Sequence, residues 1–97
     1  MKIVWSDQSR DDLRAIRDFI GRDSEHYAQL QIERIIRRVE RVADMPTMGH
    51  PIHEFPKTDL RECHEGGYRI IYRFDDSELQ VVTLVHMRQK MNRRRIR

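Results

Sequence analysis

The stretch from Leu60 to Arg88 limits the possible folds most, because two turn signals divide it into three runs of strand-forming residues. Residues 66–67, both glycine, form one turn, and residues 75–77, Asp-Asp-Ser, form the other. Glycine accepts a positive φ, and Asp and Ser side chains bond back to their own backbone. Val, Ile, Tyr and Phe dominate the flanking runs, as in β-strands. The pattern therefore predicts a three-stranded antiparallel meander.

Strand pairing assigns the side chains of this meander to two faces. With Phe74 opposite Leu79 and a regular register, alternation gives each strand an apolar side and a mixed side. The apolar face, which we expect to form the core, comprises Tyr68, Ile70, Tyr72, Phe74, Leu79, Val81 and Val85. The mixed face comprises Leu60, Glu62, His64, Arg69, Ile71, Arg73, Val82, Leu84 and His86. This register predicts that Arg69 and His86 are diagonal neighbours, within reach of one ligand.

Two amphipathic helices are expected before the meander. Ser6 is a good N-cap for the first helix, which runs to about Ile20, and Ser24 caps a longer second helix that Pro46 ends. Only residues 22–23 separate Gly21, a plausible C-cap, from Ser24, so the helices must form an antiparallel hairpin. A short strand at residues 2–5 precedes them. Residues 1–97 are therefore expected to form one two-layer α+β domain, β-αα-βββ, in which the hairpin covers a small, largely antiparallel sheet.

Composition indicates the compartment. No apolar run is long enough to cross a membrane, and the N-terminal residues lack the apolar segment of a signal peptide. The lone Cys63 builds no disulfide framework, and on the core face it is a small buried hydrophobe rather than a nucleophile. We therefore expect a cytoplasmic protein without a membrane partner.

The excess of positive charge lies at the C-terminal end. Residues 88–97 contain six Arg or Lys and no acid. This basic tail is either a solvated terminus or a segment that docks on an acidic partner or a phosphate backbone.

The loop at residues 45–57 contains two histidines, His50 and His53. They are better explained as solvated loop residues than as metal ligands, because no Cys or carboxylate cluster stands at ligand spacing. No metal or other cofactor is expected.

Several short motifs, in this order and spacing, resemble the ParE/RelE superfamily of bacterial toxins from type II toxin–antitoxin systems. The matching residues are Trp5, Asp12, Leu13, Ile16, Pro46, Gly49, Leu60, Arg61, Glu62, Tyr68, Arg69, Ile70, Tyr72, His86 and Arg88. The resemblance covers essentially the whole chain and is closer to ParE. It implies the two-layer fold, and a cognate antitoxin that wraps the toxin and neutralises it in a hetero-oligomer.

The resemblance implies one of two activities. RelE-like members cut messenger RNA on the ribosome, whereas ParE-like members inhibit DNA gyrase and need no catalytic residues. Cleavage through the 2′-hydroxyl needs a base, an acid and a cation on the phosphate. In that case Arg69 and Arg88, which match arginines of RelE-like nucleases, would hold phosphate. His64 or His86 would move protons.

Departures from the RelE pattern favour gyrase inhibition. RelE-like enzymes carry a Tyr or a His-Tyr pair after the last strand, and here no aromatic residue follows Arg88. Leu60 and Glu62 replace lysines of the first meander strand. We therefore prefer a non-enzymatic gyrase inhibitor, with a ribosome-dependent mRNA endonuclease as the alternative and an inactive or regulatory homologue as a second alternative.

Six residues are candidates for partner binding: Arg61, Arg69, His86, Arg88, Arg93 and Arg94. Three have structural alternatives. Arg61 falls on the core side, where it can pair with an acid such as Asp12. Arg69 can form an ion pair with Glu62, and His86 can bond a backbone carbonyl. We expect the antitoxin to present an amphipathic, acidic segment along the helical hairpin or the open sheet edge.

Overall fold

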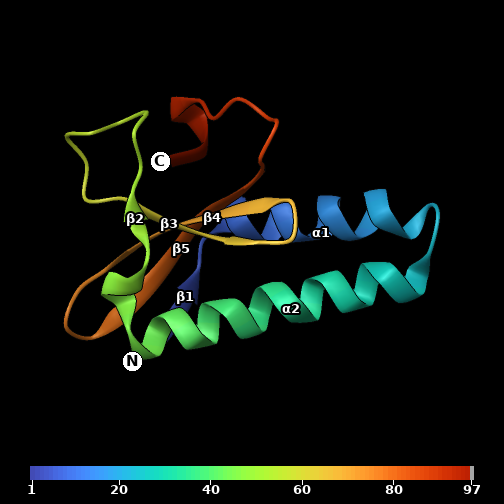
Figure 1. Cartoon of the computed structure of the whole chain (residues 1–97), viewed down its shortest axis with the longest axis horizontal. Helices are drawn as coiled ribbons and strands as arrows, with labels where there is room; N and C mark the ends of the chain where they lie inside the picture. The colour runs from blue at the N-terminus through green and yellow to red at the C-terminus, as the bar shows by residue number, and fades with distance from the viewer. Residues whose placement is uncertain (97) are drawn as a thin grey trace.

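A computed structural model describes residues 1–96 and has the expected α+β architecture (Figure 1). The elements are β1 (Lys2–Trp5), α1 (Asp7–Gly21), α2 (Glu25–Asp44), η1 (Pro46–Met48), β2 (His50–Pro51), β3 (Arg61–Glu65), β4 (Tyr68–Phe74), β5 (Glu78–His86) and η2 (Arg93–Ile96). The strands form one sheet in the order β1-β5-β4-β3-β2. β1 is parallel to β5, and the other pairs are antiparallel. The two-residue β2 lies in a segment that the sequence predicts to be a loop.

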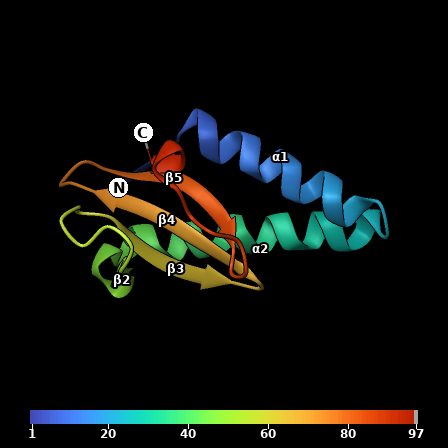
Figure 2. The ribbon, with the colours of Figure 1, turned by 90° about the horizontal axis from the view of Figure 1, so that it is seen from above.

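The two helices begin where the sequence predicts. Ser6 Oγ accepts the Ser9 N–H at 3.0 Å, and Ser24 Oγ accepts the Tyr27 N–H at 3.1 Å. Their apolar sides pack on one face of the sheet in a core that includes Ile16, Ile35, Val39, Val42, Cys63, Ile70, Tyr72 and Leu79. Figure 2 shows that the turn between α1 and α2 projects well beyond the sheet. The hairpin therefore offers surfaces that no strand covers.

A bulge in β5 corrects the predicted register. Phe74 lies opposite Leu79 as expected, but the pairing shifts between Ile71 and Tyr72, so His86 lies opposite Tyr68. The extra residue on β5 reverses the alternation for residues 84–86. As a result Leu84 joins the helix-covered core, while Val85 lies opposite Arg69. The expectation that Leu84 and His86 share a face with Arg69 is therefore wrong, as is the assignment of Val85 to the core face.

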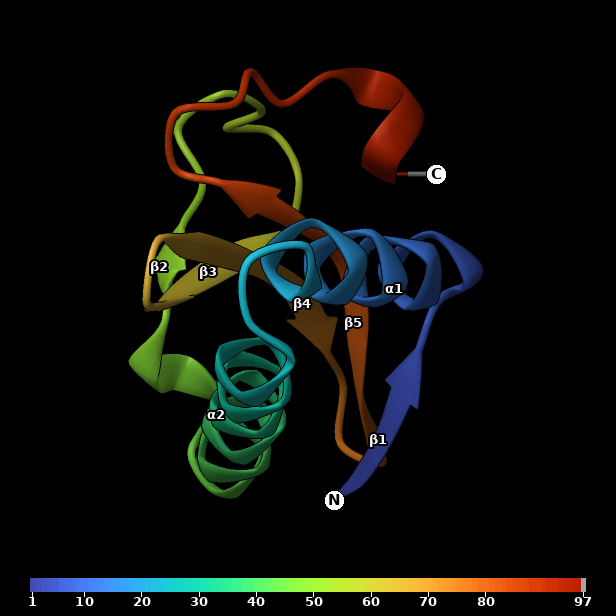
Figure 3. The same ribbon diagram turned by 90° about the vertical axis from the view of Figure 1, so that its right-hand side faces the viewer.

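The other face of the sheet is covered too. Ile52, Leu60, Ile71 and Val82 form a second small core, and Phe55, Met91 and Ile96 pack against it. Figure 3 shows the tail and the loop before β3 together on the side of the sheet away from α2. As far as Ile96, the tail is thus not simply a solvated terminus, because Met91 and Ile96 pack on the domain itself. No helix within residues 1–96 has the length and apolar character needed to cross a membrane.

Candidate functional site

Arg69 is the most constrained of the candidate residues. Its side chain is only 9% exposed and lies between two carboxylates, from Glu54 in the loop and Glu62 on β3. Nη1 and Nη2 donate to Glu54 at 2.6 and 2.9 Å, and Nη2 also donates to Glu62 Oε2 at 2.5 Å. The hydrogen bonds to Glu54 raise the pKa of the guanidinium further above its ordinary value, and burial opposes them. The ion pair with Glu62 that the sequence offers as a structural alternative is therefore present.

The Arg69 guanidinium lowers the pKa of both carboxylates. The hydrogen bonds from Arg69 lower the pKa of Glu54 to about 2, against the opposing effect of burial. For Glu62, burial raises the pKa, but hydrogen bonds from Arg69 and His64 outweigh it and the net shift is downward. His64 lies opposite Arg69 on β3, and its Nε2 is 2.6 Å from Glu62 Oε1. His64, Glu62, Arg69 and Glu54 thus form one connected polar network.

His86 lies outside this network. Its ring meets the ring of Tyr68 edge-on, with the centroids 5.4 Å apart, so it projects from the opposite face of the sheet to Arg69. His86 Nδ1 accepts the backbone N–H of Arg88 at 3.1 Å, which places the proton of a neutral ring on Nε2. This contact differs from the expected hydrogen bond to a carbonyl. The predicted neighbourhood of Arg69 and His86 is therefore wrong.

Arg61 and Asp12 each have a partner that the sequence does not reveal. Arg61 Nη1 donates to the carbonyl of Gly49 at 2.7 Å, so the expected pairing of Arg61 with Asp12 is wrong. Asp12 Oδ2 instead accepts from Thr83 Oγ1 at 2.6 Å and from the Leu84 N–H at 2.9 Å, and Arg95 donates to Oδ1 at 3.0 Å. β1 pairs only with Glu78–Val81 of β5, so Asp12 satisfies the edge of β5 beyond β1 and fastens the tail to α1.

Three further arginines of the described tail point outward. Arg88, Arg93 and Arg94 are exposed, and within residues 1–96 none of them has a carboxylate within 4.0 Å. The guanidinium of Arg93 lies over the ring of Phe55, 5.4 Å from its centroid. It borders a small cleft of about 200 Å³ with Glu54, Phe55, Pro56, Lys57 and Thr58. We call Arg88, Arg93 and Arg94 the basic tail surface.

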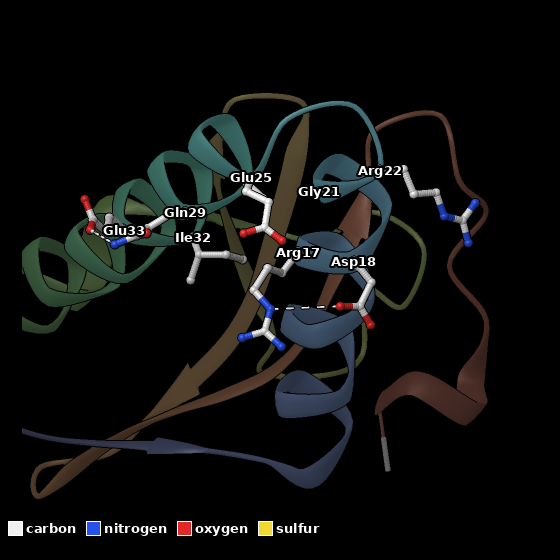
Figure 4. Close-up of a pocket in the computed structure, with 9 residues that line it drawn as sticks. Arg17, Asp18, Gly21, Arg22, Glu25, Gln29, Ile32 and Glu33 are labelled. Carbon is white, nitrogen blue, oxygen red and sulfur yellow. Dashed lines mark hydrogen bonds and ion pairs between the residues drawn. The ribbon is translucent and has the colours of Figure 1, made fainter.

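A larger groove lies between the helices at the projecting end of the hairpin (Figure 4). It has a volume of about 720 Å³ and is lined by Arg17, Asp18, Gly21, Arg22, Glu25, Ala28, Gln29, Ile32 and Glu33. The small residues Gly21 and Ala28 let the helices approach closely, and Ile32 adds an apolar surface. Arg22 is exposed at the end of α1, whereas Arg17 lies 3.9 Å from Asp18. This helical groove therefore combines apolar and charged groups.

The structure thus groups the candidate residues differently from the sequence. His64 and Arg69 are together, whereas His86 lies at the end of β5 on the other face, and Arg88 follows it. Nothing in the sequence singles out Glu54, because a carboxylate in a loop belongs to no periodic pattern. Within the described part of the chain, no group of three or more His, Cys, Asp or Glu is placed to hold a metal ion. Burial raises the pKa of Cys63 to about 11, which disfavours the nucleophilic thiolate.

Comparisons with known proteins agree with the observed architecture. Residues 3–91 match the family model of the ParE toxin of the type II toxin–antitoxin system parDE. The chain is similar to a structure of the chromosomal ParDE system of P. aeruginosa, with 18% identity, a TM-score of 0.74 and coverage of 89% of this chain and 95% of that chain. It is also similar to the toxin–antitoxin complex RelBE2 of Mycobacterium tuberculosis, with 17% identity, a TM-score of 0.65 and 88% coverage of each chain. No curated protein sequence matches the chain.

Proposed function

Because this chain belongs to the ParE toxin family of type II toxin–antitoxin systems, we propose that it arrests growth by binding DNA gyrase, in the cytoplasm, until a cognate antitoxin neutralises it. The observation that carries this proposal is the separation of the groups that RNA cleavage would need. Arg69, the candidate phosphate ligand, is held by two carboxylates, and His86 projects from the opposite face of the sheet. A binding protein needs no such cluster, only an accessible surface.

We assign target binding to the basic tail surface, Arg88, Arg93 and Arg94. These side chains are exposed on a segment that is fixed to the domain by Met91, Ile96 and Arg95. A fixed backbone lowers the entropy lost on binding, so exposed cations on it can recognise an acidic surface efficiently. Arg61 and Arg69 are left out of this surface because their guanidinium groups already have partners, and His86 borders it through Arg88.

The helical groove is the proposed docking site of the antitoxin. An amphipathic, acidic segment would place apolar side chains against Ala28 and Ile32 and a carboxylate near Arg17, whose guanidinium borders the groove (Figure 4). Such a segment folds as it binds, and uses apolar and cationic surface together. The groove has its own acids, Glu25 and Glu33 on α2 and Asp18 on α1, so the complementary segment should bring its negative charge to Arg17 rather than spread it along the groove.

One observation favours the ribosome-dependent nuclease as a second candidate. His64 Nε2 contacts Glu62 at 2.6 Å on the same face as Arg69, an arrangement in which the carboxylate can orient the imidazole for proton transfer. For this activity Arg69 would have to leave Glu54 and Glu62 to reach phosphate. Moving Arg69 away would leave two partly buried carboxylates without a cation, which is unfavourable, so we place this activity second.

Two parallel assays with the purified full-length protein test the proposal: supercoiling by gyrase, and messenger cleavage on programmed ribosomes. We expect blocked supercoiling and intact messenger. The double variant Arg93→Gln/Arg94→Gln should weaken the inhibition. Arg10→Gln/Arg14→Gln, which removes two arginines that already face Asp7 and Asp11, is the charge-matched control and should inhibit like wild type.

Cleavage of messenger that disappears in His64→Ala would overturn the gyrase assignment in favour of the nuclease. His86→Ala should not affect such cleavage if the His64 face is the active one. If the wild-type protein neither inhibits supercoiling nor cleaves messenger, an inactive or regulatory homologue is favoured. Antitoxin binding would then be its remaining activity.

A further inference from the structure

Four arginines share one face of α2. Arg34, Arg37, Arg38 and Arg41 follow the spacing i, i+3, i+4, i+7, which places them in one stripe about 10 Å long on a helix that rises 1.5 Å per residue. Arg34, Arg37 and Arg41 are exposed, and Arg38 is half-buried. We call these residues the arginine quartet.

The like charges within this stripe oppose helix stability. Arg34 with Arg38 and Arg37 with Arg41 are like-charge pairs at i, i+4, and each such pair destabilises a helix by roughly 0.2–0.5 kcal/mol. Within residues 1–96, no carboxylate lies within 4.0 Å of any of the four guanidinium groups. Arg38 leans towards the buried Cys63 thiol, whereas the exposed Arg34, Arg37 and Arg41 have no carboxylate partner and are held in place by the helix.

Acids on the same helix border the arginine stripe. Glu33, Glu40 and Asp44 recur at seven- and four-residue spacing, which places them together along a neighbouring side of α2. Glu33 with Arg37, and Arg41 with Asp44, stand at the spacing of helix ion pairs, but within residues 1–96 neither pair lies within 4.0 Å. The guanidinium groups of Arg34, Arg37 and Arg41 therefore stay available on the surface.

We propose that the arginine quartet is a binding surface for the phosphate backbone of duplex DNA. The nature of the surface argues for phosphate. An acidic protein segment is usually held by apolar anchors as well as by charge, and the exposed apolar side chains of α2 lie outside the quartet, with Tyr27 two turns before it and Ile36 on the groove side. Phosphate binding needs no such anchor, because release of counterions from DNA supplies the free energy.

The shape of the surface argues for a duplex. Single strands are bound in grooves whose aromatic side chains stack on bases, and the arginine quartet is a convex helix face with no aromatic residue within it. Figure 3 shows α2 on one side of the sheet and the tail on the other. DNA on α2 therefore leaves the basic tail surface accessible, so this inference stands whether or not gyrase is the target.

Fluorescence anisotropy with a labelled duplex of arbitrary sequence tests the inference, with the full-length protein titrated at several salt concentrations from about 50 to 200 mM. Each phosphate contact contributes about 0.9 to the slope of log K against log salt. Arg37→Gln/Arg41→Gln should therefore make the slope shallower by about 2 and weaken binding at low salt. Both side chains are exposed, so the variant should melt like wild type.

The matched control is again Arg10→Gln/Arg14→Gln, which changes the net charge by the same amount. It should keep the wild-type slope, because these two arginines already face carboxylates. Equal effects of the two double variants, or absence of duplex binding by the wild-type protein, would overturn the inference. If poly-glutamate binds as tightly as the duplex and loses affinity in Arg37→Gln/Arg41→Gln, the surface binds an acidic protein segment instead of DNA. None of these outcomes involves gyrase, so they are distinguishable from a failure of the proposed function.

Discussion

Arg69 on β4 and Glu54 in the loop before β3 form a two-point ion pair, with N–O distances of 2.6 and 2.9 Å. The two residues are 15 positions apart, and their contact fastens the loop to the sheet. The loop in turn supplies Ile52 and Phe55, which pack with the tail over the second face. Arg69 therefore helps to hold the whole cover of that face.

Removing this guanidinium should destabilise the protein strongly. Arg69→Ala would leave Glu54 and Glu62 partly buried without a cation, and loss of one partner of a buried pair costs about 3–5 kcal/mol. Urea unfolding of the variant and of wild type measures the difference. Arg73→Ala is the control, because its side chain is 39% exposed and 3.8 Å from Asp59, so it should cost less than about 1 kcal/mol. Equal losses in the two variants would contradict a buried role for Arg69.

Acid should weaken the same contact. The pKa of Glu54 is lowered from 4.5 to about 2 in the folded protein, so the folded state holds this carboxylate ionised more firmly than the unfolded state does. The resulting stability is fully present above pH 4.5 and is lost as the pH falls towards 2. Glu54→Gln should therefore lose less stability than wild type over that range. Thermal unfolding of both proteins at a series of pH values is the measurement. If Tm falls equally with pH in Glu54→Gln and wild type, Glu54 is not the source of the acid sensitivity.

Gly49 should tolerate no side chain, because the hydroxyl of Tyr72 occupies the space. That hydroxyl accepts the Gly49 N–H at 3.0 Å and donates to the carbonyl of Pro46 at 2.7 Å. A Cβ at Gly49 would collide with the Tyr72 ring and with the Glu62 carbonyl. Tyr72→Phe should cost about 1–3 kcal/mol for the unpaired groups it leaves.

The change Gly49→Ala should be at least as costly as Tyr72→Phe, and each kcal/mol should lower Tm by about 4–8 °C. Gly21→Ala is the matched control, since its Cβ would meet only the Ala28 Cβ at 3.9 Å. In a helix this change is expected to be neutral or stabilising by up to about 1 kcal/mol. A Gly49→Ala variant that melts like wild type would show that the Tyr72 contact is dispensable.

Antitoxin binding should depend on the charge of the groove wall. Arg17→Glu reverses an exposed charge at the helical groove, and it should weaken the complex about tenfold at low salt, by about 1.4 kcal/mol. Salt screens such contacts, so the difference from wild type should shrink as salt is added. Calorimetric titration with the antitoxin measures both effects. Arg34→Glu on another face of α2 is the charge-matched control, and an equal loss in this variant would argue against the groove.

Local signals were enough to predict the elements and their order. The caps at Ser6 and Ser24, the stop at Pro46 and the turns at residues 66–67 and 75–77 depend on neighbouring residues only, and all are confirmed. The ion pair of Arg69 with Glu62 was also within reach of the sequence, because both residues fall on one face of adjacent strands. The groove, by contrast, depends on how closely two helices approach, and no local pattern reports that distance.

The amino-acid sequence by itself determined the helical hairpin, the meander and the family, because periodicity, capping and turn chemistry act over a few residues. Tertiary structure alone decided which groups meet. The bulge between β4 and β5 separated His86 from Arg69, since one extra residue reverses the side of every residue after it. The loop places Glu54 beside Arg69, and the tail places Arg95 beside Asp12, which is 83 residues earlier in the chain. Such long-range contacts follow from the packing of the whole chain around two apolar cores.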